Sequence, residues 1–576
     1  MRRATAAWRW RWRHARSLSA AATRGLPTAL LSSEERPWRV GGRAVGAAVA
    51  ALCAGVSSTA LADAASDIDE DEDEHVFVNW SASHECRPVA LHVPETIEDL
   101  ERILATYQDK RQKLRCMGAG VSPNGLGFSA ATATATATAA HRQQHEALLS
   151  MALFDKILHV DTAAQQVTVE PGIVVGDLLD KLRDHGLTMQ NVASIRDQQV
   201  GGITQAGCHG TGAAIPPIDD HVVEMEIVTP AQGRLTLSAT QNPELFALAK
   251  CGLGALGVVT KLKLQCVPTY HLAERTIVTT MAEVRQHHVQ WLKEFQHLRY
   301  MWIPGTDAVV VVQCQRITPE QAQAAAAGDA FPPPPFTADE QMQAPRELYL
   351  ELTQGRHDPD YLSWGFTTLR DRLLELGPLD RDHVARVNQA EKQFWLLSQG
   401  FRVGLSTDII GFDCGGQQHV QEVAFPTAGT LDIDFVETLM QRIEASGVPA
   451  PAPIEQRWTA RSSSSLSPAS SAYNPSQLFC WVGIIMYLPT ADEAERRAIT
   501  SAFERYVALY RDMMEPFGGT EHWAKLEWPE DAAERQRMRE RLAKRYPLDA
   551  FRQAREALDP HHVLSNHIVD ELLRQQ

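Results

Sequence analysis

The chain has 576 residues, which is too long for one hydrophobic core and predicts two domains behind any N-terminal leader. Apolar residues make up 44% of the chain and charged residues 22%, as in soluble globular proteins. The formal net charge is −16, and residues 1–66 hold ten Arg against two Glu and one Asp, so the remaining residues carry −23. A surface this acidic argues against nucleic acid as a partner and is compatible with a basic protein partner.

The N-terminal segment has the composition of a targeting peptide. Residues 1–33 contain seven Arg and no acidic residue, so we expect a mitochondrial transit peptide over residues 1–43, with a plastid peptide as the alternative. Residues 44–62 are uncharged and just long enough to span a bilayer. They are either a weak membrane anchor or the second half of a cleaved presequence, and with the acidic run at 67–74 they form a linker over 44–75.

Short strands and helices alternate through residues 76–268, which predicts a first α+β domain. The expected helices are residues 94–110, 175–185 and 243–250, and the expected strands are residues 113–117, 157–160, 166–169, 222–229 and 258–266. Thr96 and Asp99 fit a capping box loosely, and Gly186 suits a helix C-cap. The alternating Ala and Thr of residues 131–138 predict a surface insertion that does not pack.

Two glycine-rich stretches stand out in this domain. Gly118–Gly127 directly follows an expected strand, where backbone N–H groups can surround phosphate oxygens. Gly201–Gly212 has five glycines in twelve residues, so a large cofactor could lie against the main chain itself. Each stretch taken alone could also be an ordinary turn or an irregular loop.

A third stretch, Gly252–Gly257, matches the G-x-G-x-x-G fingerprint of nicotinamide-dependent enzymes letter for letter. That site requires a strand before the glycines and a helix after them. Here the helix-like residues 244–250 come first and the strand-like residues 258–262 follow. We therefore reject a nicotinamide site and expect a tight helix-to-strand turn close to a bound cofactor.

Residues 269–576 predict a second α+β domain. We expect a strand and a helix within 276–298, a strand at 308–313, a flexible excursion at 322–345, helices within 367–399 and a strand-rich part at 412–488. The loop at 560–567 could return to the first domain. The nine cysteines include no C-x-x-C pair, so we expect neither a zinc site nor a disulfide framework.

Six segments are together far more specific than either glycine stretch. They are Gly118–Gly127, Ser194–Gln199 running into Gly201–Gly212, Gly411–Gln418, Pro451–Arg461, Trp481–Asp492 and Glu521–Lys525. By these segments the chain resembles the FAD-linked aldonolactone oxidoreductases of the vanillyl-alcohol-oxidase type, and among them the mitochondrial dehydrogenases of plants and algae. The resemblance spans about residues 79–567. It implies a two-part FAD-binding domain of the PCMH type over residues 76–268, and an α+β cap domain over 269–576 with a C-terminal segment that returns to the FAD domain.

The resemblance also implies which residues contact FAD. The matching positions are Gly118, Gly120, Ser122, Asn124, Gly125, Gly201, Gly202, Gly207 and Gly210. Val121 stands where oxidases of the family often bind FAD through a histidine, which implies non-covalent FAD. Ala193 matches an alanine beside the flavin that is thought to keep O₂ away. Cys208 stands where the plant dehydrogenases usually have alanine, and it is either a reactive thiol or an inert buried one.

The substrate end centres on Glu455 and Arg457. They are two residues apart in an expected strand, so both side chains point to one face. The pair suits a polyol or a lactone, and it would also suit an ordinary cross-strand ion pair; the resemblance implies substrate binding. Lys525 matches a lysine near the flavin, where it would stabilise developing negative charge. Cys414 is either an oxidation-sensitive thiol near the substrate path or a buried structural thiol.

Taken as a whole, the resemblance implies an enzyme that oxidises L-galactono-1,4-lactone to L-ascorbate by hydride transfer to FAD. Cytochrome c would accept the electrons, and the enzyme would lie at the mitochondrial inner membrane or in the intermembrane space. Two alternatives stay open: an oxygen-using aldonolactone oxidase, and an assembly or scaffold role for respiratory complex I. The preference between galactono- and gulono-lactone also stays open.

Overall fold

The computed structural model describes residues 76–128, 132–133, 146–328, 330–412, 414–471, 474 and 476–574. The expected transit peptide and linker, and most of the Ala-Thr run, lie outside the described residues. Residues 77–355 and 366–576 form one compact unit, which contains every element discussed below. Within the described ranges, no helix combines the length and the apolar composition needed to cross a bilayer.

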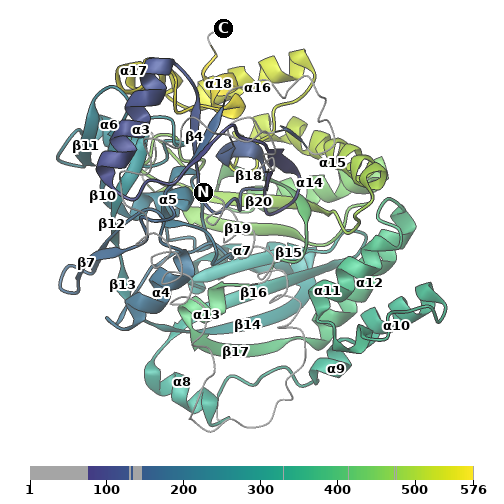
Figure 1. Ribbon diagram of the computed structural model, residues 1–576. Helices are drawn as coiled ribbons and strands as arrows, with labels where there is room; N and C mark the ends of the chain where they lie inside the picture. Colours follow the sequence, from purple (N-terminus) through teal and green to yellow (C-terminus); the bar gives the residue numbers. More distant parts are fainter. Residues whose placement is uncertain are drawn as a thin grey trace. The chain divides into compact units, whose positions relative to one another are not determined.

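The first half of this unit is built on small sheets (Figure 1). In the described part of the chain, a parallel sheet has the order β3-β6-β4 and an antiparallel sheet has the order β11-β10-β12-β8-β7. Two further sheets have the orders β1-β2-β5 and β13-β9. The strands are β1 (Phe77–Val78), β2 (His84–Cys86), β3 (Leu91–His92), β4 (Leu114–Met117), β5 (Thr132–Ala133), β6 (Ala147–Ser150), β7 (Ile157–Asp161), β8 (Gln166–Val169), β9 (Leu187–Thr188), β10 (Val222–Thr229), β11 (Gly233–Ser238), β12 (Val258–Gln265) and β13 (Val267–Pro268).

The helices of this half are α3 (Ile97–Lys110), α4 (Val175–Arg183), α5 (Val200–Gln205) and α6 (Pro243–Ala249), with the 3₁₀ turns η1 (Gly125–Gly127) and η3 (Ile218–His221). Three of the helices, α3, α4 and α6, begin and end close to the predicted residues, whereas α5 was not predicted. The capping box of α3 is complete, because Thr96 Oγ1 accepts from the Asp99 N–H and Asp99 accepts from the Thr96 N–H. Helix α6 precedes the glycines at 252–257 and strand β12 follows them, so the predicted order of helix, glycines and strand is confirmed, which is the reverse of the nicotinamide fingerprint.

The second half is built on a large antiparallel sheet. Its order among the described residues is β17-β14-β16-β15-β19-β20-β18-β21. The strands are β14 (His271–Thr280), β15 (His297–Trp302), β16 (Ala308–Ile317), β17 (Gly400–Leu405), β18 (Gln418–Thr427), β19 (Ile454–Ala460), β20 (Leu478–Tyr487) and β21 (Thr520–Glu521). The helices are α7 (Met281–Glu294), α8 (Pro319–Ala326), α9 (Ala338–Gln341), α10 (Gln343–Thr353), α11 (Phe366–Glu375), α12 (Arg381–Leu397), α13 (Ser406–Ile410), α14 (Leu431–Ser446), α15 (Glu493–Met514), α16 (Ala532–Arg545), α17 (Leu548–Leu558) and α18 (His567–Leu573), with the 3₁₀ turn η5 (Glu515–Phe517).

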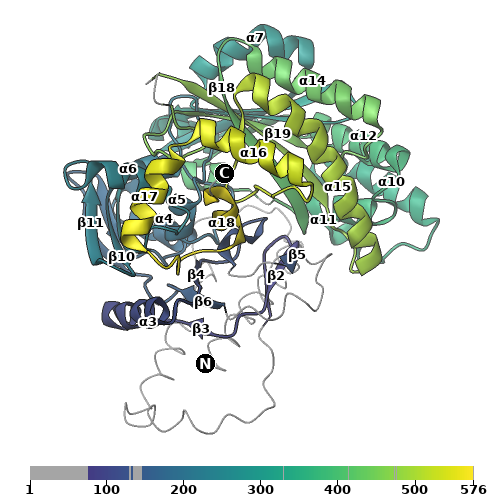
Figure 2. The same cartoon turned by 90° about the horizontal axis from the view of Figure 1, so that it is seen from above.

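The two faces of the large sheet have different neighbours. Helices α7, α14 and α15 cover one face (Figure 2), where Val284, Phe435 and Tyr506 from these helices are fully buried in one core with Trp458 and Val482 from the strands. Burying these side chains stabilises the sheet by the hydrophobic effect. The other face carries the polar residues discussed below. The α+β class predicted from the sequence is confirmed.

Two predictions for the second half need correction. The expected excursion at 322–345 contains helical turns, because Thr318 and Gln321 form a capping box at the start of α8 and Thr337 and Glu340 form another at α9. The part expected to be strand-rich contains helix α14 between β18 and β19. Its buried residues Ile433, Val436, Leu439 and Ile443 recur every three or four positions, which is the helical period.

The C-terminal segment lies against the first glycine-rich stretch. The Leu114 N–H donates to the Val563 carbonyl at 2.9 Å, and the Asn124 side chain donates to the carbonyls of Trp523 and Leu526 at 2.9 and 2.8 Å. Asn566 is buried and donates to the carbonyls of Gly125, Leu126 and Phe128 at 3.3, 2.9 and 3.0 Å. The last helix is thus hydrogen-bonded to a loop more than 400 positions earlier in the chain.

Replacing Asn566 by Ala tests this connection. The change removes a buried donor from three carbonyls. It also removes the N-cap of α18, because Asn566 Oδ1 accepts a hydrogen bond from the Val569 N–H at 3.0 Å. We expect the free energy of unfolding to fall by about 2–4 kcal/mol, measured by urea denaturation. The matched control is Gln536→Ala on the exposed side of α16, where a change within about 0.5 kcal/mol is expected. Equal effects of the two substitutions would contradict the prediction.

Candidate active site

A cavity of about 500 Å³ lies between the glycine-rich stretches and the polar face of the large sheet. One wall consists of residues from the first glycine-rich stretch and from positions 193–209. The opposite wall consists of side chains from β15, β18, β19 and β20, with helices α11 and α12 at one end. The cavity is therefore formed by segments from the whole compact unit.

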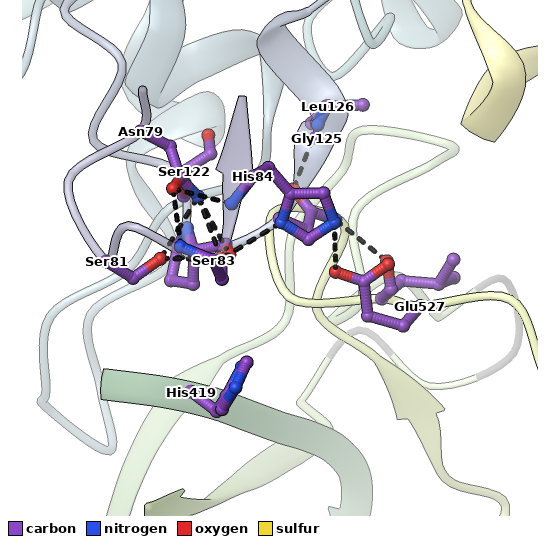
Figure 3. A network of polar contacts seen from close by, with 12 residues as sticks. Asn79, Ser81, Ser83, His84, Ser122, Gly125, Leu126, His419 and Glu527 are labelled. Carbon is purple, nitrogen blue, oxygen red and sulfur yellow. Dashed lines mark hydrogen bonds and ion pairs between the residues drawn. The ribbon is translucent and has the colours of Figure 1, made fainter. Parts of the chain in front are cut away.

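The first glycine-rich stretch is held in shape by hydrogen bonds from the N-terminal segment at residues 79–83. Figure 3 shows Asn79, Ser81 and Ser83 beside Ser122, and all three side chains also donate hydrogen bonds to the Pro123 carbonyl. The Asn79 amide donates to the carbonyls of Ser122 and Pro123 at 3.0 Å each, and the Ser83 hydroxyl donates to the Pro123 carbonyl at 2.6 Å. These buried bonds occupy the carbonyl oxygens of Ser122 and Pro123. The shape of the loop is thus set by the protein itself.

His84 lies at the edge of this network. Its Nδ1 is 2.9 Å from the Ser83 hydroxyl and its Nε2 is 3.3 Å from the Glu527 carboxylate (Figure 3). Burial lowers the pKa of His84 to about 4, so the ring is neutral at pH 7. This neutral ring connects the N-terminal strands to the segment that carries Lys525.

The second glycine-rich stretch is partly helical. We expected a loop over Gly201–Gly212, but residues 200–205 form α5, in which the Thr204 hydroxyl donates to the Gly201 carbonyl at 2.9 Å. A Cβ at Gly201 would lie 2.8 Å from Cβ of Pro171, so glycine allows the helix to pack closely there. A Cβ at Gly202 would have no heavy atom within 4 Å, and Gly202 lines the cavity.

Most of the predicted cofactor contacts line the cavity. They are Gly118, Gly120, Ser122, Asn124, Ala193, Gly201, Gly202 and Cys208. Gly125, Gly207 and Gly210 lie behind its wall: a Cβ at Gly207 would be 3.1 Å from Cys251 Sγ, and one at Gly210 would be 2.1 Å from Asn191 Oδ1. Tight packing requires glycine at these last two positions.

On the glycine-rich side of the cavity, a terminal nitrogen (Nη1) of Arg115 and Oε1 of Gln198 are buried and have no hydrogen-bond partner among the described residues. The remaining guanidinium nitrogens of Arg115 donate to the carbonyls of Leu126 and Leu253 at 2.9 and 2.7 Å. Buried polar groups normally have partners, so a cation, an amide and glycine-lined backbone here fit a large cofactor with anionic and polar groups. Sequence reasoning missed Arg115, although a charged residue inside a buried strand was a signal.

The three predicted catalytic residues lie together on the opposite wall. Glu455 and Arg457 point to the same face of β19, and Arg457 Nε is 3.3 Å from a Glu455 oxygen. Lys525 lines the same cavity. Arg299 of β15 is a second cation near Glu455, with a guanidinium nitrogen 3.7 Å from a Glu455 oxygen. Its guanidinium carbon also lies 4.0 Å from the centre of the Phe412 ring.

Sequence reasoning missed Glu422, which joins these residues. Its carboxylate accepts one hydrogen bond from Arg457, at 2.8 Å, and another from the Lys525 ammonium. One of its oxygens also lies 3.2 Å from Nε2 of His209. Burial alone would raise the pKa of Glu422, but the charges of Lys525 and Arg457 outweigh burial and hold the pKa well below its usual range. Glu422 is thus an anion at neutral pH. Its signal in the sequence was a lone carboxylate within the largely buried strand β18.

Two histidines that line the cavity, His209 and His522, lie beside the buried Trp481. The His209 ring stacks on Trp481 with centroids 3.7 Å apart, and burial lowers the pKa of both His209 and His522. Nδ1 of His522 accepts from the Ala524 N–H, so its proton is on Nε2. Ligand atoms of His209, Glu422 and His522 lie within 4.8 Å of one another, but two cationic side chains already engage the carboxylate. That pairing disfavours a metal ion there.

The two cysteines of interest differ in their surroundings. Cys208 is buried, and burial raises its pKa to about 11, which keeps the thiol protonated and unreactive. Cys414 lines the cavity, with its Sγ 3.3 Å from the Ser194 hydroxyl.

Two protein families match the chain. Residues 88–238 match the family described as FAD binding domain, and residues 262–332 and 373–572 match the family described as D-arabinono-1,4-lactone oxidase. The first match covers both glycine-rich stretches. The second match covers the large sheet and the C-terminal segment.

Several curated proteins are similar over most of their length. The chain is 47% identical over 518 residues to L-galactono-1,4-lactone dehydrogenase 2, mitochondrial, of Oryza sativa subsp. japonica, covering 87% of this chain and 84% of the rice protein. It is 45% identical over 520 residues to the mitochondrial L-galactono-1,4-lactone dehydrogenase of Arabidopsis thaliana, covering 87% and 82%. The L-gulonolactone oxidase of Bos taurus is 27% identical over 500 residues, covering 86% and 98%.

Among solved structures, cholesterol oxidase from B. sterolicum has the same fold, with a TM-score of 0.67 at 16% identity over 87% of this chain and 97% of that chain. The FAD-binding family match and the cavity chemistry identify FAD as the cofactor. This chain belongs to the FAD-dependent aldonolactone oxidoreductases, in the family that includes the mitochondrial L-galactono-1,4-lactone dehydrogenases of plants.

Proposed function

We propose that this enzyme oxidises L-galactono-1,4-lactone at C2, forming L-ascorbate in the last step of its biosynthesis, with cytochrome c as the electron acceptor. The observation that carries the proposal is the meeting of Glu455, Arg457 and Lys525 on the wall facing the FAD-binding segments. The names of the rice and Arabidopsis relatives supply the substrate.

The side chains of this wall suit the proposed substrate. FAD supplies a two-electron hydride acceptor when bound. Glu455 accepts a hydrogen bond from a lactone hydroxyl, and Arg457 donates to the lactone oxygens, so together they orient C2. Lys525 would stabilise the negative charge that develops on the hydride-accepting ring or on the substrate oxygen. The surrounding apolar residues exclude water and strengthen these interactions.

We further propose that FAD is bound without a covalent link and that the enzyme is a dehydrogenase. Val121 lines the cavity and has no nucleophilic atom, and Ala193 places a methyl group on the cavity wall. The mitochondrial names of the relatives support a place at the inner membrane or in the intermembrane space. An acidic chain is compatible with a basic partner such as cytochrome c. An additional role in complex I assembly remains an alternative.

Glu455→Gln tests the substrate site. The substitution keeps the side-chain shape but removes the charge that accepts substrate hydroxyls, so we expect kcat/KM for the lactone to fall about 10–100-fold while FAD stays bound. Anaerobic stopped-flow reduction of the flavoprotein with a panel of lactones measures this. A substrate preference other than L-galactono-1,4-lactone in the unmodified enzyme, or an unchanged rate in the variant, would argue against the proposal.

Ala193→Gly tests the exclusion of oxygen. Removing the methyl group opens space at the cavity wall, so we expect the variant to gain peroxide formation with O₂, while the unmodified enzyme reduces cytochrome c and forms little peroxide. Parallel assays with O₂ and with cytochrome c measure the two rates. Substantial peroxide formation by the unmodified enzyme would instead support the oxygen-using oxidase.

Removal of FAD tests its mode of binding. Since Val121 provides no attachment point, denaturation in acid should release all of the flavin into the supernatant, and its absorbance there should account for the whole content. Flavin that remains with the precipitated protein would contradict non-covalent binding.

A further inference from the structure

We infer that Glu422 is a positioning residue for the reaction: its carboxylate fixes Arg457 and Lys525, and Gly483 leaves open the space through which Arg457 reaches it. This inference rests on the function proposed above. Glu422 itself is 2% exposed, so it acts through the two cations that face the cavity.

The sheet register brings these residues into rows. Glu455 of β19 pairs with Gly483 of β20, and Gly483 pairs with Glu422 of β18, so the three positions form one row on the polar face. Arg457 pairs with Trp481, one row away on the same face. To contact Glu422, the Arg457 side chain must therefore cross strand β20 diagonally.

Gly483 makes this crossing possible. Arg457 contacts Glu455 at 3.3 Å on one side of β20 and Glu422 at 2.8 Å on the other. A Cβ at Gly483 would point to the same face, with Cγ and Oε1 of Glu422 both 3.9 Å away. A methyl group fits at that distance, but a longer side chain would extend into the path of the guanidinium.

The contacts of Glu422 explain how one carboxylate holds both Arg457 and Lys525 in place. Its two oxygens divide the contacts, with Arg457 on Oε1 and Lys525 and His209 on Oε2. Without the anion, two cations would face each other in a buried site with only Glu455 to balance them. Both side chains would then move apart, and the wall that faces the substrate would change shape.

A purely structural ion pair is the competing explanation, and the opposite face of the same sheet provides a matched control. Asp432 is also fully buried, with a histidine nitrogen of His288 at 3.1 Å and the Trp458 indole N–H at 2.5 Å. These residues belong to the core beneath α7 and α14 and do not line the cavity. Loss of this carboxylate should affect stability alone.

The first experiment compares Glu422→Gln with Asp432→Asn in FAD-loaded full-length enzyme. We expect Glu422→Gln to lower the limiting rate of anaerobic flavin reduction by L-galactono-1,4-lactone about 10-fold or more, and Asp432→Asn to leave it within about 2-fold. Flavin absorbance and the melting temperature report FAD content and folding in each variant. Equal rates for both variants would overturn the inference.

A double-mutant cycle separates positioning from stability. If Glu422 acts through Arg457, the rate loss caused by Glu422→Gln should be smaller in an Arg457→Ala background than in the unmodified enzyme. Equal factors in the two backgrounds would overturn the inference, since a structural defect reduces the rate independently of Arg457.

Variants of Gly483 test the crossing without removing any charge, and they decide the matter if Glu422→Gln does not fold. Gly483→Ala should reduce flavin at nearly the unmodified rate, whereas Gly483→Leu should be about 10-fold slower or more with unchanged FAD content and melting temperature. Equal rates for Ala and Leu would overturn the inference alone. If no lactone reduces the flavin of the unmodified enzyme, the proposed function is wrong, and the inference that rests on it is wrong as well.

Discussion

The burial of one carboxylate constrains the polar wall of the cavity. An ion removed from water is stable only when its neighbours supply charge and hydrogen bonds in good geometry. Glu422 satisfies this requirement with partners from three separate parts of the chain: His209 from the FAD-binding half, Arg457 from the large sheet and Lys525 from the C-terminal segment. The positions of these parts relative to one another are therefore linked through a single anion.

The cavity shows the same principle on a larger scale. The shape of its glycine-rich wall is fixed by hydrogen bonds from other parts of the chain, from Asn79 and Ser83 on one side and from Asn566 on the other. Some residues that line it, such as Arg115, have a buried polar atom with no hydrogen-bond partner among the described residues. A wall prepared in this way binds an extended cofactor without a large loss of conformational entropy, because its loops are already ordered.

Local sequence patterns were sufficient for much of the fold and for part of the site. The capping box at Thr96 and Asp99 and the alternation that places Glu455 and Arg457 on one face are properties of neighbouring residues. Glu422 could not be assigned in this way, because its role depends on the register between β18 and β20, which pairs residues about 60 positions apart. Helix α14 was missed because its helical period was hidden between two strands of an otherwise strand-rich segment.

The glycines illustrate the same limit. Gly202 and Gly207 look alike in the sequence, but one faces the cavity and the other packs against Cys251. Only the tertiary structure distinguishes a glycine that leaves room for a ligand from one that leaves room for the protein.

The hydrogen bonds from Asn566 to the first glycine-rich stretch also determine when the cofactor site can form during synthesis. The loop at 118–127 is synthesised more than 400 residues before α18. Domains usually fold in order from the N-terminus, but this loop lacks some of its hydrogen-bond partners until α18 has been made. The loop therefore reaches its final hydrogen-bonded form only after α18 has been synthesised.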